Sequence, residues 1–310
     1  MEKQKNFLSA VVYVRNNEDA VAPFLKNMIP FVEKNFENSE IILVNDFSSD
    51  ATVEQIKACK DLATSTAISV VNLSYFHGIE TAMNAGVDLS IGDFVLEIDS
   101  VFADYDLCQI EKAFLKTLEG FDIVSASPAK KLRFTSSIFY MAYKEFSGTH
   151  DSLRTESFRV LTRRAVNRIN SMNKTVPFRK ALYSNCGLKT FNFAYETIKT
   201  SSKAKDKNNT YRRKVATDAL LLFTDAGYFF AKTITAIMCF ISLGMLAYTV
   251  AVYLLAKPVA GWTTTLLFLS VAFLFLFSIL LIIIRYLQIL VQLAFRRTKY
   301  SFESIEKLTK

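Results

Sequence analysis

The stretch GDFVLEIDSVFADYD, residues 92–106, decides how this chain is read, because an apolar run ends there in carboxylates. FVLEI has the β-branched and aromatic content of a buried strand. Asp99 follows it directly, and Asp104 comes soon after. Carboxylates at the carboxyl end of a strand are typical ligands of a cation that carries substrate phosphates. Val101 and Ala103 stand where further oxygen ligands are expected, so a complete metal site, an incomplete one and a plain loop all remain open.

Outward from this stretch, short β-rich runs alternate with helical stretches between residues 7 and 125. The expected strands, in chain order, are FLSAVVYV, EIILVND, AISVVNL, GDFVLEID and FDIVSAS. Amphipathic stretches such as EDAVAPFLKNMIPFVEK lie between them. This alternation predicts an α/β domain with a mostly parallel sheet covered on both faces. Ligands of such sheets bind beyond the carboxyl ends of the strands, where VNDFSSDAT and EIDSVFAD both fall.

Two long apolar runs follow in the C-terminal third of the chain. Residues 233–256 and 259–284 contain no charged side chain. A bilayer core of about 30 Å needs about 20 helical residues, so each run is long enough to span it. We expect transmembrane helices over residues 228–256 and 259–290, joined by a short turn. Two buried core helices are the alternative, which two adjacent runs of this length disfavour.

Basic residues flank these runs on one side. Six precede the first run: Lys203, Lys205, Lys207, Arg212, Arg213 and Lys214. Three follow the second: Arg296, Arg297 and Lys299. The turn carries only Lys257, so the positive-inside rule predicts an integral protein of the inner or plasma membrane whose N-terminal domain and both termini are cytoplasmic. The net charge of +8 fits an anionic membrane surface and not nucleic acid, because the basic residues cluster beside the runs.

The chain therefore divides into segments around the apolar runs. We expect a cytosolic domain over residues 1–209, an interfacial amphipathic helix over 210–227, the two spans, and a cytosolic tail over 291–310. A surface helix packed on the domain is the alternative for residues 210–227. Four scattered cysteines and two histidines indicate neither a disulfide framework nor a zinc centre.

Four segments resemble family 2 glycosyltransferases: VVYVRNNED, VNDFSSDAT, HGIETAMNAGVDLSIGDFVLEIDS and SFRVLTRRAV. With the two C-terminal spans, their order is similar to that of polyprenyl-phosphate glycosyltransferases, relatives of dolichol-phosphate mannose synthase. The resemblance implies a Rossmann-like nucleotide-diphospho-sugar transferase domain of the GT-A type, followed by a transmembrane hairpin. It implies an inverting enzyme that moves a sugar from a nucleotide sugar to undecaprenyl or dolichyl phosphate at the cytosolic membrane face, and it leaves room for a homo-oligomer.

The resemblance also assigns roles to individual positions. Asn17, Glu18, Asp46 and Gly78 match residues that lie near the nucleotide in the family. Asp99 matches the first Asp of the DxD motif, which reaches the metal and the sugar diphosphate.

The metal motif departs from the family pattern. Val101 replaces the second Asp of DxD, and Ala103 replaces a polar residue. We therefore expect Asp99 to hold a Mg²⁺ or Mn²⁺ ion that the nucleotide sugar already carries, with Asp104 reaching in from the next turn. The alternative for Asp104 is a cap on the helix YDLCQIEKAF.

The residues expected near the acceptor also differ from the family pattern. Ser157 stands at the position before Phe158 and Arg159 where the family usually has Asp. A sugar hydroxyl as acceptor needs a general base. A lipid phosphate, with a second pKa of about 6, is already anionic and needs arginines instead. The resemblance implies that Arg159 and Arg163 bind phosphate groups, and Arg179 is a further candidate for the acceptor phosphate. Asp99 and Arg159 are expected to be catalytic. A solvated basic face is the alternative for these arginines.

The incomplete motif keeps a second function open, namely a catalytically impaired family member that serves as a membrane scaffold or regulatory partner. Alanine at Asp99 or Arg159 separates the two functions, because a scaffold keeps its biological effect after either change.

Overall fold

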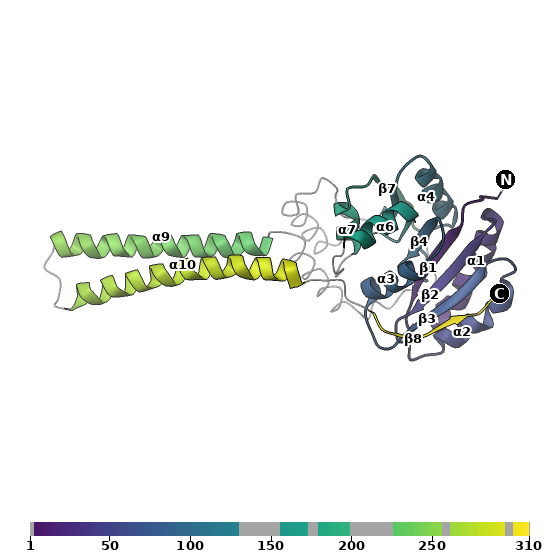
Figure 1. Ribbon diagram of the computed structural model, residues 1–310, viewed down its shortest axis with the longest axis horizontal. Coiled ribbons are helices and arrows are strands. Elements are labelled where there is room, and N and C mark those ends of the chain that lie inside the picture. Colours follow the sequence, from purple (N-terminus) through teal and green to yellow (C-terminus); the bar gives the residue numbers. More distant parts are fainter. Residues whose placement is uncertain are drawn as a thin grey trace. The chain divides into compact units, whose positions relative to one another are not determined.

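One mixed sheet organises the part of the chain that the computed structural model describes, which is residues 3–129, 156–172, 179–198, 226–255, 261–294 and 300–309. Its strands are β1 (Leu8–Val14), β2 (Ser39–Asn45), β3 (Ala67–Leu73), β4 (Phe94–Ile98), β5 (Ile123–Pro128), β6 (Phe158–Thr162), β7 (Thr190–Tyr195) and β8 (Phe302–Lys307). Their order across the sheet is β7-β5-β6-β4-β1-β2-β3-β8, and Figure 1 labels all of them but β5 and β6. Only β6 and β8 run against the other described strands, so the predicted mostly parallel sheet is confirmed.

Helices cover both faces of this sheet. They are α1 (Glu18–Asn35), α2 (Thr52–Ala58), η1 (Lys60–Leu62), α3 (Ile79–Leu89), α4 (Cys108–Leu118), α6 (Arg163–Ser171) and α7 (Arg179–Asn185). The main core joins α1, α2 and α4 to one face, where Val12 points. Val11 points to the other face, as alternation along a strand requires. There α3 approaches so closely that a Cβ on Gly86 would lie 2.4 Å from Val11 Cγ1.

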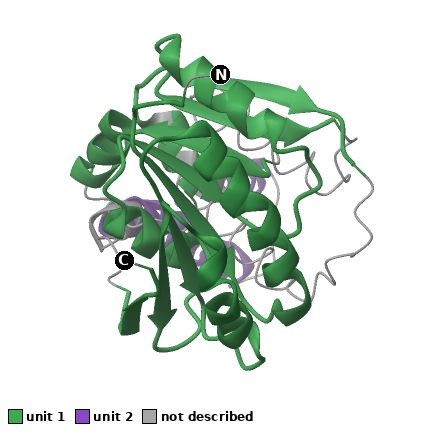
Figure 2. Ribbon diagram, turned by 90° about the vertical axis from the view of Figure 1, so that its right-hand side faces the viewer, with its two compact units in different colours: residues 1–144, 149–217, 297–310 green, residues 145–148, 218–296 purple. Residues whose placement is uncertain are grey.

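The described residues fall into two compact units (Figure 2), and the second contains α9 (Ala226–Leu255) and α10 (Trp262–Ala294). These two helices pack along each other. Residues 231–255 and 262–287 have mean hydropathies of 2.1 and 3.1, and each is long and apolar enough to cross a membrane. The expected pair of apolar helices is confirmed, whereas their crossing of a membrane stays a prediction. The helix expected over residues 210–227 lies outside the described residues except where α9 begins.

The chain returns to the sheet after α10, a feature that the sequence pattern did not indicate. β8 pairs antiparallel with β3, and Val71 lies opposite Ile305. Lys57 Nζ lies 2.6 Å from Glu306 Oε2, and the backbone N–H of Ile68 donates to Thr309 Oγ1 at 2.7 Å. β8 is thus an edge strand in which exposed side chains alternate with partly buried ones, and Glu303 and Lys307 are among the exposed ones.

Glu33 fixes the loop that leads into β3. Its Oε1 accepts from the backbone N–H groups of Thr64, Ser65 and Thr66 at 2.7, 2.8 and 3.0 Å. Its Oε2 accepts from Thr64 Oγ1 at 2.8 Å. Burial raises the pKa of Glu33, but these hydrogen bonds outweigh burial and lower the pKa from 4.5 to about 2.

This pKa makes Glu33 a contributor to stability at neutral pH. The folded pKa is lower than the unfolded one, so the contribution is full above pH 4.5 and is lost as the pH falls towards about 2. Glu33→Gln is expected to lower the free energy of unfolding by about 1 kcal/mol at neutral pH, since the side chain is partly exposed. Denaturant unfolding should find that the difference vanishes near pH 2. A difference that is constant with pH contradicts the assignment.

Candidate active site

The carboxyl edge of the sheet collects most of the candidate residues. Asp99 follows the last residue of β4 and so lies just past this edge. β6 runs antiparallel to β4 and sets Arg159 directly opposite Glu97. α7 begins at Arg179, which contacts both acidic residues. Asp99, Arg159 and Arg179, which are distant in sequence, thus meet in one cluster.

Glu97 lies at the centre of this cluster and is fully buried. Its Oε2 lies 2.5 Å from Arg159 Nη1 and 2.8 Å from Arg179 Nη1. Its Oε1 accepts a hydrogen bond from the Tyr183 hydroxyl at 2.6 Å. Each arginine is only 1% exposed. Because a buried cation is costly unless it is paired, Glu97 is what allows two guanidinium groups to lie side by side here.

Asp99 bridges the same two guanidinium groups at the margin of the cluster. Its Oδ1 accepts from Arg179 Nη2 at 2.6 Å, and its Oδ2 accepts from Arg159 Nη2 at 3.3 Å. The side chain of Asp99 is 20% exposed, whereas that of Glu97 is 0% exposed. Burial raises the pKa of Asp99, but the charges of Arg159, Arg179 and Lys180 outweigh it and hold that pKa well below its usual range. Asp99 is therefore a carboxylate throughout the physiological pH range.

Two further carboxylates complete the cluster. Glu80 Oε2 accepts from the backbone N–H and from Nε of Arg179, at 2.9 and 3.1 Å. Glu156 Oε2 accepts from Arg159 Nε at 3.1 Å. Four carboxylates, counting Glu97 and Asp99, thus lie with two guanidinium groups, and the charge of Lys180 also acts on Asp99, which leaves a formal charge of −1. An acidic excess of this kind favours a divalent cation at the exposed margin.

The second position of the acidic motif points away from this margin. Val101 is 5% exposed and belongs to the main hydrophobic core. Among the residues described, no three His, Cys, Asp or Glu side chains are placed to hold a metal ion together. Asp104, the expected second ligand, accepts from the Tyr195 hydroxyl at 2.7 Å. At the start of α4, Asp106 Oδ1 accepts from the Cys108 N–H at 3.0 Å. A role of Asp104 as a metal ligand stays a prediction.

Asp46 organises the loop that precedes α3. It is fully buried, its Oδ1 accepts from the N–H of His77 at 2.8 Å, and its Oδ2 accepts from the N–H of Gly78 at 2.9 Å. The Tyr13 hydroxyl donates to Oδ2 at 3.0 Å. The next residue, Phe47, has a φ of +58°, in the left-handed region that favours glycine. Contact of Asp46 and Gly78 with a nucleotide stays a prediction.

Asn17 and Glu18 connect the loops that follow β1 and β2. The Asn17 N–H donates to Thr52 Oγ1 at 2.7 Å, and the Glu18 N–H donates to Asp50 Oδ2 at 3.2 Å. In return, Glu18 Oε2 accepts from the Ala51 N–H at 3.1 Å. These bonds hold two neighbouring loops together at the carboxyl edge, where a nucleotide is predicted to bind.

Arg163 is not brought to this edge, so the structure separates it from Arg159 and Arg179, the other residues expected at the acceptor phosphate. Its Nε donates to the Gly92 carbonyl at 2.9 Å, and its Nη2 lies 3.2 Å from Ser90 Oγ. Gly92 and Ser90 precede β4, so they lie at the amino end of that strand. Because β6 runs antiparallel to β4, it delivers Arg159 to the carboxyl edge and Arg163 to the opposite one.

Sequence reasoning missed Glu80 and Tyr183 as members of the cluster. Glu80 lies in the first turn of α3, and Tyr183 lies one turn into α7. Both elements are remote from β4 in sequence, so the signal available was limited to the polar character of Glu80 within an otherwise apolar helix face.

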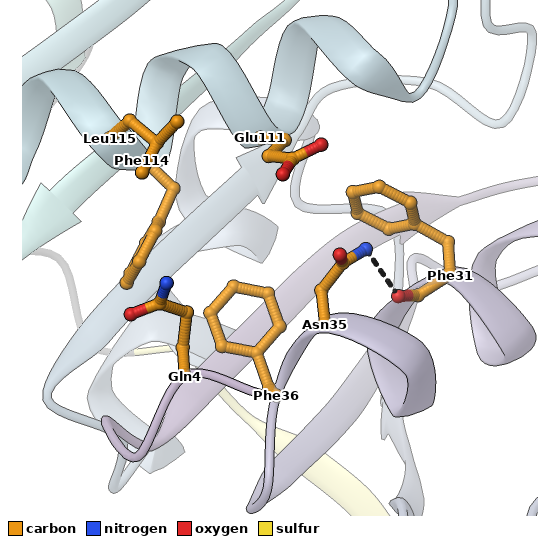
Figure 3. Close-up of a pocket in the computed structure, with 7 residues that line it drawn as sticks. All are labelled: Gln4, Phe31, Asn35, Phe36, Glu111, Phe114 and Leu115. Atoms are coloured by element: carbon orange, nitrogen blue, oxygen red, sulfur yellow. Dashed lines mark hydrogen bonds between the residues drawn. The ribbon is translucent and has the colours of Figure 1, made fainter. Parts of the chain in front are cut away.

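A small pocket of about 120 Å³ lies away from the cluster (Figure 3). Gln4 precedes β1 and Phe36 precedes β2, so the pocket lies at the amino ends of these strands. Its lining residues are Gln4, Phe31, Asn35, Phe36, Glu111, Phe114 and Leu115. Asn35 Nδ2 donates to the Phe31 carbonyl at 2.8 Å, so this side-chain amide is hydrogen-bonded to the backbone of its own helix.

With this geometry in place, comparison with known proteins becomes informative. Residues 9–168 match the family described as Glycosyl transferase family 2. The chain belongs to this family. The match covers every element from β1 to most of α6, including Asp46, Asp99 and Arg159.

Three relatives are similar to parts of the chain. An uncharacterized glycosyltransferase of Synechocystis is 29% identical over 74% of this chain and 79% of its own length. A prophage bactoprenol glucosyl transferase homolog of Escherichia coli is 32% identical over 59% of this chain, which spans 61% of that protein. An undecaprenyl-phosphate 4-deoxy-4-formamido-L-arabinose transferase of Edwardsiella ictaluri is 31% identical over 32% of this chain and 30% of that protein.

Solved structures establish the fold. Glucosyl-3-phosphoglycerate synthase of Mycobacterium tuberculosis superposes with a TM-score of 0.50, 14% identity, and coverage of 69% of this chain and 80% of that one. The same enzyme in complex with Mn²⁺, UDP and glucosyl-3-phosphoglycerate gives a TM-score of 0.51 at 14% identity, with coverage of 69% and 80%. The described domain of this glycosyltransferase therefore has the expected GT-A fold.

The central position of Glu97 predicts a large effect of neutralising it. Glu97→Gln leaves Arg159 and Arg179 buried with one anion fewer, so the free energy of unfolding should fall by about 3 kcal/mol. Glu119→Gln is the control, since Glu119 forms an exposed pair with Lys116 worth about 0.5 kcal/mol. Denaturant unfolding at neutral pH measures both. Equal losses in the two variants contradict the central role of Glu97.

The burial of Val101 predicts that restoring the family carboxylate does not restore a metal site. Val101→Asp should lower the free energy of unfolding by about 2–4 kcal/mol, because it puts a carboxylate in the core. Mn²⁺ affinity, measured by calorimetry on the folded fraction, should not rise. Val101→Asn, of the same size without the charge, separates the cost of polarity from that of charge. Stronger Mn²⁺ binding without loss of stability contradicts this prediction.

Proposed function

We propose that this protein transfers a sugar from a nucleotide sugar to a polyprenyl phosphate at a membrane surface. Membership of glycosyl transferase family 2 supports the transfer, and the bactoprenol and undecaprenyl-phosphate transferase relatives support the acceptor. The observation that carries the proposal concerns the residue before β6 and the arginines beside it. The position before β6 holds Ser157, a hydroxyl and not a carboxylate base, while Arg159 and Arg179 lie within the adjoining cluster.

A phosphate acceptor suits such a site because it brings its own negative charge. Its oxygen attacks the anomeric carbon and forms the new C–O bond, while the bond from that carbon to the diphosphate breaks. The electron pair leaves with the nucleoside diphosphate, and a single in-line displacement inverts the anomeric centre. No proton has to be removed from the nucleophile, so the site needs positioning and charge neutralisation and not a general base.

The ion pairs of the cluster suggest how phosphate reaches the arginines. Arg159 and Arg179 are each 1% exposed, and Asp99 occupies one Nη2 of each. A phosphate group can replace Asp99 on these guanidinium groups if Asp99 gains another cation. We propose that substrate binding exchanges the Asp99–arginine pairs for arginine–phosphate pairs and an Asp99–cation pair, which keeps every buried charge matched.

The residues fit a Mg²⁺ or Mn²⁺ ion that enters with the nucleotide sugar. Asp99, at 20% exposure, would hold it, and Asp104 would join after releasing Tyr195. One or two carboxylates with substrate phosphates are a usual set of ligands for Mg²⁺. When bound, the ion would neutralise charge on the departing diphosphate.

We further propose that α9 and α10 cross the membrane and keep the catalytic domain beside its lipid acceptor. The length and apolar character of both helices support this. The basic residues before α9 and after α10 support a cytoplasmic position for the domain and for both termini.

A second candidate function is that of a scaffold or regulatory partner without transfer activity. The burial of Val101 and the engagement of both Asp99 oxygens by arginines favour it. The transfer assay described next decides between the transferase and the scaffold.

The test uses the full-length protein with undecaprenyl phosphate in vesicles and a screen of nucleotide sugars, with and without EDTA. We expect a lipid-linked sugar from one donor and loss of activity with EDTA. Arg179→Gln should lower kcat/KM for the lipid phosphate by about 100-fold, as loss of a group that stabilises developing charge does. Arg163→Gln, its matched control at the opposite edge, should change kcat/KM by less than about 3-fold once folding is verified.

Failure of the wild type to form a lipid-linked sugar from any donor, while it still binds a nucleotide, contradicts the transferase proposal and supports the scaffold. Equal losses in Arg179→Gln and Arg163→Gln contradict the assignment of the cluster as the acceptor site.

A further inference from the structure

Tyr105 carries a hydroxyl that none of the described residues satisfies. It lies in the loop between β4 and α4, is 6% exposed, and its oxygen is buried without a hydrogen-bond partner. Its ring packs against Phe158 and Tyr195, with centroids 4.5 and 5.8 Å apart. Native proteins rarely leave a buried hydroxyl unpaired, so one at the edge of a candidate active site points to a missing partner.

The Tyr105 hydroxyl is available as a donor. A phenol, with an ordinary pKa of about 10, keeps its proton at neutral pH and has one hydrogen bond to give. Although two carboxylates lie near, it donates to neither of them in this structure.

A chain of polar groups continues from this point. The Tyr195 hydroxyl lies 2.7 Å from Asp104 Oδ1 and 2.6 Å from Ser157 Oγ. Together with Tyr105, this group presents hydroxyls and one carboxylate, whereas the cluster around Glu97 presents guanidinium groups. The carboxyl edge thus has two neighbouring surfaces of different chemistry.

The two surfaces suit different parts of a nucleotide sugar. A diphosphate is anionic, so guanidinium groups attract it. A sugar ring is neutral, and its hydroxyls can accept a hydrogen bond from a phenol. The side with the Tyr105 hydroxyl is the one that matches a sugar.

We propose that Tyr105 donates a hydrogen bond to an oxygen of the donor sugar ring and so helps to select that sugar. This inference rests on the proposed transferase function. The Tyr105 hydroxyl is covered in this structure, so the loop between β4 and α4 moves when the sugar binds, as the exchange at Asp99 also requires.

Tyr105→Phe tests the inference with the nucleotide sugar that the wild type uses in the donor screen. The KM for this donor should rise about 3- to 10-fold, the effect of one lost hydrogen bond. The inhibition constant of the nucleoside diphosphate, which lacks the sugar, should stay within about 2-fold, because the guanidinium side is untouched. The melting temperature without ligand should be equal or higher, since the variant no longer buries an unpaired donor.

Ser39→Ala is the matched control for the loss of a buried hydroxyl. Ser39 Oγ lies 2.8 Å from Thr66 Oγ1 in the strands' amino-terminal region, remote from the cluster. This variant should lose some thermal stability and leave both constants unchanged.

Three results overturn the inference while the transferase function stands. The first is an unchanged KM in Tyr105→Phe, and the second is an equal rise of KM and of the inhibition constant. The third is a changed Mn²⁺ requirement at constant KM, which would mean that the Tyr105 hydroxyl donates to a water on the metal ion and not to the sugar. A wild type that transfers no sugar overturns the transferase function and this inference with it.

Discussion

The buried carboxylate of Glu97 is the constraint on which the candidate site depends. It lies within 2.8 Å of guanidinium nitrogens from both Arg159 and Arg179, and it accepts from Tyr183. Two buried cations would repel each other and lose their hydration, so neither arginine could stay at this edge without a shared anion. Because these residues come from β4, β6 and α7, one carboxylate joins three elements that carry the chemistry.

The same constraint explains the unusual state of Asp99. Its oxygens pair with the two arginines, and the cluster as described has more carboxylates than guanidinium groups. The proposed exchange, with a cation for Asp99 and an anion for the arginines, follows from these pairs. It would couple binding of a charged diphosphate to rearrangement of the loop after β4.

Much of the fold followed from the sequence, because alternation of strands and helices is a local property that residue type and spacing record. The expected strands correspond to β1 through β5, and the apolar runs correspond to α9 and α10. The motifs also singled out Asp99 and Arg159, which the structure brings together. They did not indicate that Arg163 lies at the opposite edge, because the direction of β6 relative to β4 is not recorded in the spacing of SFRVLTRRAV.

The sequence by itself determined the α/β class, the two apolar helices and the choice of Asp99, Arg159 and Arg179 as candidates. Only the tertiary structure decided which charged residues meet, because ion pairs among Glu80, Glu97 and Arg179 join residues that lie far apart along the chain. It likewise decided that Val101 belongs to the core and that Tyr105 holds an unpaired hydroxyl. Burial and pairing are set by what packs around a side chain, and sequence spacing does not carry that information across elements.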